Sequence, residues 1–425
     1  DDGVEFFGGT VNASNFYLEN NEDDAIDWTE GWNGTMAKAY VLHTASFSTV
    51  VEADGVNNNP TVNGLTAVST VGGTALQFKK ASGATMNGVT LNGYDTNVQL
   101  KDPSQGSFDD IIIDGIASDP NASYGSSTTK ASDFAWAGAE DSTSSFILPS
   151  MVTSDLSLDA SISYILDGVV SVESGATLTI PAGTQITADS GAEATATYIV
   201  VQKGGMIDIQ GTSSAPVVMT ASAASPGSWG GLVIAGDATT TEGIDATAEV
   251  GGIIYGGTND SDSSGSINYL VIEYAGAQIN SESQFNGLTL YAVGSGTTVS
   301  NVAIVNGTDD GVEFFGGTVN ASNFYLENNE DDAIDWTEGW NGELNGAYVL
   351  HSISGFSTAV EADGVNNNPT LTNLTCVSTT GGTALQFKKA SGATINGLSL
   401  SGYATQVQLK DPSQGSFDDI IIDGS

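Results

Sequence analysis

The amino-acid sequence predicts an all-β protein, a parallel β-helix (solenoid) built in tandem units. Three observations predict this fold: a long internal repeat, a shorter period of 22–25 residues inside it, and alternating apolar and polar residues between glycine- and asparagine-rich turns. A solenoid accounts for all three. A single coil cannot bury its apolar side alone, whereas stacked coils bury a continuous column.

The long repeat defines the predicted organisation. Residues 1–116 return almost unchanged as residues 309–425, with one inserted glycine, Gly355. Tandem copies of a large unit are typical of long structural proteins and have little use in an enzyme. We therefore predict that residues 1–117 are the C-terminal half of a preceding unit, that 118–150 form a connector, and that 151–425 form a complete unit. Phe134 and Trp136 are the candidate junction residues of this small, polar connector.

The shorter period places one apolar residue per coil in a common column. Its members are Val4, Ile26, Val51, Leu76 and Val98 in the first copy, and Val312, Ile334, Val360, Leu385 and Val407 in the second. Each column position leads into a second alternating stretch, such as SNFYLEN or KAYVLHT, that is rich in β-branched and aromatic residues. Such segments, bounded by Gly, Asn and Asp, are typical of short strands separated by tight turns.

Composition excludes several classes of partner. Asp and Glu total 51 against nine Lys and Arg, which gives a net charge of −42, so binding to nucleic acid is excluded on electrostatic grounds. The 40% hydrophobic content excludes global disorder. No apolar run is long enough for a membrane span. The lone cysteine, Cys376, takes the place of Ala67 in the first copy, which indicates a small buried residue and excludes a disulfide framework.

Three motifs carry a resemblance to a known group of proteins. They are GATLTIPAGTQI (175–186), GMIDIQGT (205–212) and SPGSWGGLVIAG (225–236). Together with the repeats, they resemble right-handed parallel β-helix proteins of bacterial cell surfaces, an uncharacterised secreted and lipoprotein group of pectate-lyase-like architecture. The resemblance implies a right-handed β-helix. It implies little about activity, because the same architecture serves lyases and phage tailspikes.

Acidic residues recur at equivalent places on successive coils. In a solenoid, residues one coil apart lie roughly 5 Å from each other, so carboxylates in register repel unless a cation lies between them. Calcium prefers such oxygen ligands, which makes Ca²⁺ the candidate cofactor; a solvated acidic face with no ordered ion is the alternative. The candidate ligands are Asp2, Glu5, Asp23, Asp24, Asp27, Glu52, Asp54, Asp310, Glu313, Asp331, Asp332, Asp335, Glu361 and Asp363.

Carbohydrate binding is a second chemical hypothesis. Paired carboxylates next to aromatic residues occur in glycosidases, and the candidate glycan contacts are Trp28, Trp32, Trp336 and Trp340. The competing interpretation is that these rings belong to the core. The lysine groups Lys79, Lys80, Lys101 and Lys388, Lys389, Lys410 indicate ion pairing with nearby acids. His43 and His351 lack a second metal ligand nearby, so no catalytic residue is predicted.

The sequence favours a structural function. We predict a stretch of an extracellular bacterial surface fibre, filament or adhesin stalk, stiffened by Ca²⁺ and joined to other copies of the same repeat by end-to-end stacking or self-assembly. The alternative is a β-helix that binds or cleaves an extracellular polysaccharide. The first interpretation predicts no enzymatic activity; the second predicts a polysaccharide lyase or hydrolase.

Overall fold

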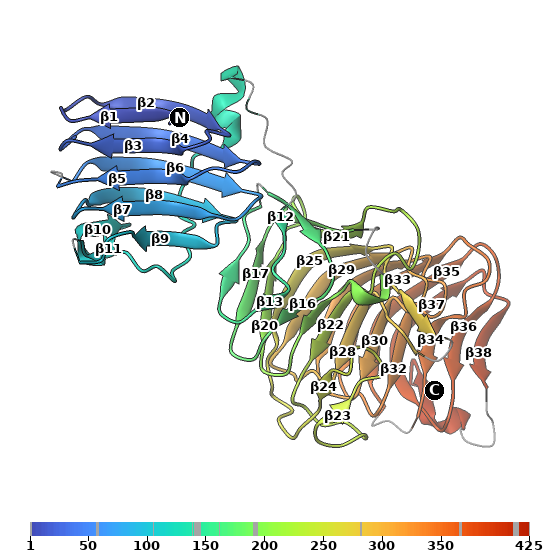
Figure 1. The fold of residues 1–425 in the computed structure, drawn as a ribbon. Helices are drawn as coiled ribbons and strands as arrows, with labels where there is room; N and C mark the ends of the chain where they lie inside the picture. Colours follow the sequence, from blue (N-terminus) through green and yellow to red (C-terminus); the bar gives the residue numbers. More distant parts are fainter. Residues whose placement is uncertain are drawn as a thin grey trace. The chain divides into compact units, whose positions relative to one another are not determined.

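The computed structural model describes residues 2–56, 59–104, 106–137, 139, 146–160, 162–189, 194–280, 283–364, 368–410 and 416–424. They form a parallel β-solenoid of about 16 turns, with 50% of the residues in strands and 4% in helices. The predicted all-β parallel solenoid is confirmed. The chain divides into two compact units, Asp1–Phe146 and Ile147–Ser425 (Figure 1).

The first unit contains two sheets of stacked strands. The five-stranded sheet has the order β1 (Val4–Phe7), β3 (Asp24–Thr29), β5 (Thr49–Asp54), β7 (Thr74–Lys79) and β9 (Thr96–Leu100). The six-stranded sheet has the order β11 (Ile116–Ala117), β10 (Ile111–Ile113), β8 (Ala84–Asn92), β6 (Thr61–Ser69), β4 (Thr35–His43) and β2 (Ala13–Glu19). Two short 3-10 helices, η1 (Phe108–Asp110) and η2 (Ala131–Ala137), accompany them.

The second unit continues the same architecture over more coils. Its 10-stranded sheet contains β13 (Met151–Val152), β16 (Val170–Val172), β19 (Ile199–Val201), β22 (Leu232–Ala235), β28 (Leu288–Tyr291), β30 (Val312–Phe315), β32 (Ile334–Thr337), β34 (Thr358–Ala362), β36 (Thr383–Phe387) and β38 (Thr405–Leu409). Its 14-stranded sheet contains β12 (Phe146–Ile147), β14 (Leu156–Ser157), β15 (Ser163–Leu166), β17 (Thr177–Pro181), β18 (Gln185–Ala188), β20 (Met206–Gln210), β21 (Val217–Ala221), β25 (Gly265–Glu273), β29 (Thr298–Val305), β31 (Asn320–Glu327), β33 (Glu343–His351), β35 (Thr370–Ser378), β37 (Ala393–Ser401) and β39 (Ile420–Ile422). The remaining elements are the hairpins β23 (Ala246–Thr247) with β24 (Ile254–Tyr255) and β26 (Gln278–Asn280) with β27 (Ser283–Gln284), and the 3-10 helices η3 (Ala194–Ala196) and η4 (Phe417–Asp419).

The long strands of the 14-stranded sheet bend near their middle. β20 pairs with the first half of β25 and β21 with its second half, so one long strand replaces two short strands of the preceding coil. The bend in the following strands falls on a left-handed residue, such as Asn301 (φ 56°), Asn323 (φ 57°) or Gly397 (φ 70°). Asn and Gly tolerate this conformation best, which explains their recurrence at the corner.

The apolar column predicted from the sequence lies in register inside the solenoid. Val312, Ile334, Val360 and Leu385 are directly paired on successive coils and are fully buried. Because side chains alternate across a strand, the residue two positions further along also points inward. This position holds Phe314 and Trp336 and completes the core.

The four candidate glycan-contact tryptophans are core residues. Trp28, Trp32, Trp336 and Trp340 each have 0% of their surface exposed. In the second copy, Phe314 stacks on Trp340 with ring centroids 4.0 Å apart. The Trp340 indole N–H donates to the carbonyl oxygen of Val319 at 3.1 Å. The prediction that these indoles contact a glycan is therefore wrong, since no ring face is open to solvent.

The predicted connector packs against the first unit. We call residues 118–139 the strap; Gly138 lies outside the described residues. The strap forms an antiparallel bridge between Gly125 and Thr90, and further along the chain its Phe134 is fully buried in a cluster with Tyr40. The second junction candidate, Trp136, is 76% exposed. Within the described residues, no helix is long and apolar enough to cross a membrane.

Candidate metal centre

A ladder of polar side chains runs along the outer face of the 10-stranded sheet. Thr289, Glu313, Asp335, Glu361 and Gln386 are paired in register on β28, β30, β32, β34 and β36. Each follows an inward-pointing column residue, so strand alternation turns it outward. The ladder thus places three carboxylates on three consecutive coils.

Most of these carboxylates are buried even though they lie outside the core. Glu313 and Asp335 are each 9% exposed, and Asp310, in the turn before β30, is 6% exposed. Among the described residues of the second unit, carboxylate oxygens lie within 4.8 Å of one another in three groups: Asp310, Glu313, Asp335; Asp309, Asp310, Asp331; and Asp332, Asp335, Glu361. The structure therefore unites predicted ligands from neighbouring coils.

Burial and mutual repulsion disfavour the charged forms. Burial raises the pKa of Asp310, Glu313 and Asp335 well above the usual carboxyl range, and the neighbouring carboxylates raise it further. Burial, together with the nearby Asp331, raises the pKa of Asp309 to about 8. A buried carboxylate of this kind must bind a proton or a cation.

At the far end of the ladder, the negative charge of the carboxylates is already offset by protein groups. Lys388 forms an ion pair with Glu361, and the side-chain amide of Gln386 donates to the same carboxylate at 2.6 Å. The hydroxyl of Thr358 donates to Asp332 at 2.5 Å. Among the described residues, no lysine forms an ion pair with the group of Asp310, Glu313 and Asp335, although the nearby Lys388 partly offsets the rise in the pKa of Asp335.

Buried oxygens with no hydrogen-bond partner accompany that group. Oδ1 of Asp335, Oδ1 of Asn286 and Oγ1 of Thr289 have no partner among the described residues. Asn286 is 1% exposed and its Nδ2 donates to Glu313 at 2.7 Å, which places its carboxamide at the group. Thr289 is 1% exposed and precedes Glu313 on the ladder. Carboxylate, amide and hydroxyl oxygens are the ligands of a hard cation such as Ca²⁺. We call Asp310, Glu313, Asp335, Asn286 and Thr289 the oxygen cluster.

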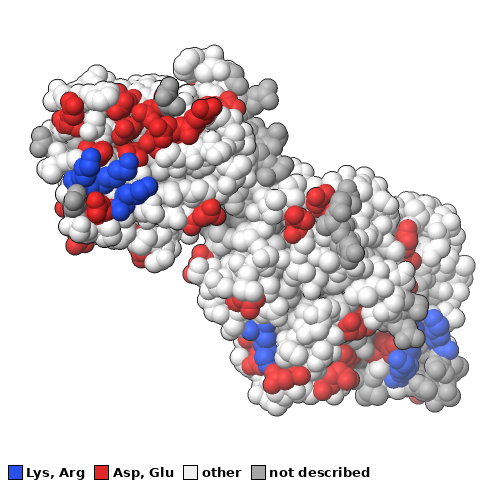
Figure 2. Space-filling model, viewed as in Figure 1, with Lys and Arg blue, Asp and Glu red and all other residues white. Residues whose placement is uncertain are grey.

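The first copy contains a more open version of these groups. Asp2, Glu5 and Asp27 lie together, as do Asp2, Asp23 and Asp24. Burial and nearby carboxylates raise the pKa of Asp27 to about 7, while Glu5 is exposed to solvent. On the face of the first unit seen in Figure 2, carboxylates form a red band with lysines beside it. The repeated sequence alone therefore does not bury the group; surrounding coils are also needed.

Three predicted ligands form ion pairs instead. Glu52 pairs with Lys79, Asp54 with Lys80 at 3.0 Å, and Asp363 with Lys389 at 3.1 Å. The ion-pairing interpretation is confirmed for Lys79, Lys80, Lys388 and Lys389, whereas Lys101 donates to the side-chain oxygen of Gln77 at 3.2 Å. Neither Glu52, Asp54 nor Asp363 belongs to a carboxylate group of the described residues.

The two histidines are packed into the fold. His351 is fully buried, stacks on Phe356 with ring centroids 3.7 Å apart, and places Nδ1 3.0 Å from the hydroxyl of Tyr403. His43 repeats this arrangement on Phe47. Burial lowers the pKa of both imidazoles to about 4, so both rings are neutral at physiological pH.

The sequence matches the family model of the pectate-lyase-like β-helix domain over residues 1–136 and 150–422. The chain belongs to this pectate-lyase-like β-helix family. A search of curated proteins finds no match. The family relationship agrees with the stacked parallel coils and leaves the chemistry to the residues of this chain.

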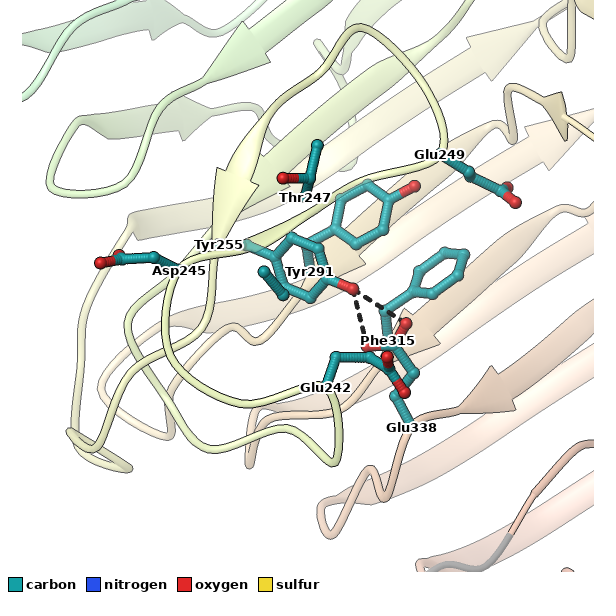
Figure 3. Close-up of a pocket in the computed structure, with 9 residues that line it drawn as sticks. Glu242, Asp245, Thr247, Glu249, Tyr255, Tyr291, Phe315 and Glu338 are labelled. Atoms are coloured by element: carbon teal, nitrogen blue, oxygen red, sulfur yellow. Dashed lines mark hydrogen bonds between the residues drawn. The ribbon is translucent and has the colours of Figure 1, made fainter.

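This pectate-lyase-like β-helix also has an open pocket beside the ladder, with a volume of about 460 Å³. Three aromatic rings line it: Tyr291 lies 4.7 Å from Tyr255 and 4.3 Å from Phe315 between ring centroids (Figure 3). Glu338 accepts hydrogen bonds from the hydroxyls of Tyr255 and Thr240 at 2.8 Å each. The remaining side chains lining the pocket are Glu242, Asp245, Ala246, Thr247 and Glu249.

Sequence reasoning missed the pocket and part of the oxygen cluster. The segment from Asp237 to Gly257 interrupts the coil period between β22 and β25, and it supplies Glu249 and Tyr255. Such an interruption is the available sequence signal, because extra residues in a regular solenoid must fold over its surface. Asn286 carried no comparable signal, since asparagine is common throughout the chain.

Proposed function

We propose that the protein is a structural β-helix whose coils are tied together by Ca²⁺ at the oxygen cluster. It would form one stretch of a tandem-repeat fibre or adhesin stalk on a bacterial surface, outside the cell. The observation that carries this proposal is the set of three buried carboxylates without an ion pair among the described residues, Asp310, Glu313 and Asp335, with unpartnered oxygens beside them. The near-identical copies 1–116 and 309–425 support the structural role.

A cation at this position has a direct mechanical effect. Thr289, Glu313 and Asp335 come from three consecutive strands of one sheet. A shared ion converts repulsion between coils into attraction along the solenoid axis. Pulling the coils apart then requires removing ligands from the ion as well as breaking backbone hydrogen bonds, which stiffens the rod.

Calcium is expected to raise the melting temperature of the full chain, and more strongly at pH 8.5 than at pH 6.5. A carboxyl whose pKa is raised by folding contributes stability below its unfolded pKa and loses it as pH rises through the folded pKa, about 8 for Asp309. Without calcium the protein should therefore weaken between these two pH values. Calcium at 100 times its Kd adds about 2.7 kcal/mol. Calorimetry in EDTA and in calcium measures both effects.

The pH range avoids interference from the histidines. Their pKa of about 4 means that their contribution to stability is lost only as pH falls below about 6.5. Magnesium serves as the control ion, because it demands a smaller octahedral site. A melting temperature that is identical in EDTA and calcium at pH 8.5 would reject the proposed cation role.

A second candidate function is carbohydrate binding in the pocket. Its carboxylates can accept hydrogen bonds from the hydroxyls of a sugar. Tyr255, Tyr291 and Phe315, which are 2%, 1% and 7% exposed, form the packed wall behind them. Burial raises the pKa of Glu338, and burial together with Glu338 raises that of Glu249. This acidic lining favours a neutral or amino sugar over an acidic one.

Replacing Glu338 by glutamine is expected to weaken sugar binding at least tenfold if the pocket is the site. The change removes the charge that accepts from Tyr255 and Thr240 and keeps the shape. Binding of neutral and amino-sugar oligosaccharides is measured by calorimetry, with Glu330→Gln, on the turn before β32, as the matched control. Equal binding by both variants would place the sugar elsewhere.

A further inference from the structure

The strap covers the outer face of the first unit in a defined order. Starting at the β8 edge, the backbone N–H of Leu91 donates to the Tyr124 carbonyl at 3.0 Å, and that of Ser126 donates to Val89 at 2.9 Å. The strap then crosses β6, where the Thr66 hydroxyl donates to the carbonyl of Thr129 at 2.8 Å. It thus satisfies exposed strand groups on β8 before it turns across the face.

The strap ends in an aromatic anchor over β4 and β2. Phe134 is fully buried in a cluster with Tyr40, Leu42 and Val68, and its ring stacks on Tyr17 with centroids 6.4 Å apart. A buried aromatic ring of this size contributes much of the binding energy of an interface. Phe134 therefore holds the strap in place.

The repeat provides the same face a second time, without a strap on it. Tyr348, the counterpart of Tyr40, is 40% exposed where Tyr40 is 6% exposed. Tyr325, the counterpart of Tyr17, is 38% exposed and lies parallel to Tyr348 with ring centroids 6.0 Å apart. The counterparts of the buried Leu42, Thr66 and Val68 are only half-buried: Leu350, Thr375 and Val377. We call Tyr325, Tyr348, Leu350, Thr375 and Val377 the open tyrosine face.

We propose that the open tyrosine face is the docking site of another segment with the sequence of the strap, one that follows the second copy as Ser118–Ala139 follows the first. The face keeps the residues around the anchor: both tyrosines, the leucine, the threonine and the valine recur at the same register on β31, β33 and β35. Two other strap contacts change, because Asn373 takes the place of Gly64 and Gly346 that of Lys38, so the Thr129 side chain of a docked strap must shift and the ion pair of Lys38 with Asp133 is lost. Each strap would cap the last coil of one unit and lock its outer face. This inference does not depend on a bound cation.

The direct test appends a second copy of the strap to the C-terminus of the full chain. Ser425 corresponds to Ile116, so residues 117–139 appended after Ser425 reproduce the natural spacing. Hydroxyl-radical labelling with mass spectrometry then reports the solvent access of Tyr348, with Tyr40 as the internal standard. We expect the labelling of Tyr348 to fall several-fold, toward that of Tyr40, and the melting temperature of the extended chain to rise.

Two control variants test the phenylalanine anchor of the strap and the open tyrosine face separately. The same extension with its phenylalanine changed to aspartate, equivalent to Phe134→Asp, should leave Tyr348 as reactive as in the unextended chain. Tyr348→Lys should abolish the gain in melting temperature from the extension, while folding of the unextended variant is confirmed by circular dichroism. Undiminished labelling of Tyr348 in the extended chain overturns the proposal. Concentration-dependent protection of Tyr348 in the unextended chain also overturns it, because a second copy would then be the occupant.

Discussion

Replacing Trp340 by alanine is expected to lower the free energy of unfolding of the second unit by about 3–5 kcal/mol. Trp340 is fully buried, stacks on Phe314, and lies 6.0 Å from Trp336 between ring centroids. The change opens a cavity in a core that closely spaced coils cannot collapse to fill. It also leaves the Val319 carbonyl without its indole donor, which adds about 1 kcal/mol. Urea unfolding followed by circular dichroism measures the loss.

Two other tryptophans serve as controls for this prediction. Trp136→Ala removes a ring that is 76% exposed and should change stability by no more than about 0.5 kcal/mol. Trp32→Ala removes the equivalent core ring of the first unit, where it stacks on Phe6. It should destabilise that unit and leave the second transition unchanged, if the two units unfold separately. Equal effects of Trp340→Ala and Trp136→Ala would contradict the assignment of Trp340 to the core.

The solenoid could be predicted from the sequence because stacked coils satisfy both the repeat of 22–25 residues and the alternation of apolar and polar residues. The aligned residues Val4, Ile26, Val51, Leu76 and Val98 are the residues that pair on successive coils. The alternation of side chains along a strand also determines in which direction the tryptophans point. Trp28 lies two positions after Ile26 and must share its inward face. The assignment of the four tryptophans as glycan contacts failed because it gave aromatic composition more weight than the alternation of side chains along a strand.

The burial of the carboxylate ladder could not be predicted in the same way. The alternation of side chains along a strand shows that Glu313 and Asp335 point outward, and an outward residue is normally solvated. Whether it is covered depends on the neighbouring coils and on the segments between strands, and the latter have no periodicity and carry no positional signal. Glu5 and Glu313 occur in identical sequence, yet Glu313 is buried beside β28, while Glu5 is exposed on β1, the end strand of its sheet.

The strap shows a similar limit. Its small, polar composition indicated a connector with few apolar residues to anchor it. In the structure it is fixed by backbone and hydroxyl hydrogen bonds to Val89, Leu91 and Thr66, and by one phenylalanine. Composition underestimates such a segment, since backbone hydrogen bonds do not depend on side-chain type.

Replacing Asp335 by asparagine is expected to have opposite effects with and without calcium. In EDTA at pH 8.5, the substitution replaces a buried acid, whose charged form is disfavoured by burial and by Asp332, with a neutral amide of nearly the same volume, so the melting temperature should rise. In calcium it removes a charged ligand from the oxygen cluster, so most of the roughly 2.7 kcal/mol gained by the wild-type protein at 100 times its Kd should be lost. Calorimetry of both proteins under both conditions measures the reversal of sign.

Matched substitutions show why this reversal is diagnostic of a cation. Asp363→Asn breaks a surface ion pair with Lys389 and should cost no more than about 1 kcal/mol, with the same sign in EDTA and in calcium. Asp27→Asn changes the equivalent residue of the first copy, where Glu5 is solvated, and should give a smaller calcium effect. If Asp335→Asn destabilised the protein in EDTA, the Asp335 charge would be stabilised by the fold itself. A calcium ion at the oxygen cluster would then have no unbalanced charge to neutralise.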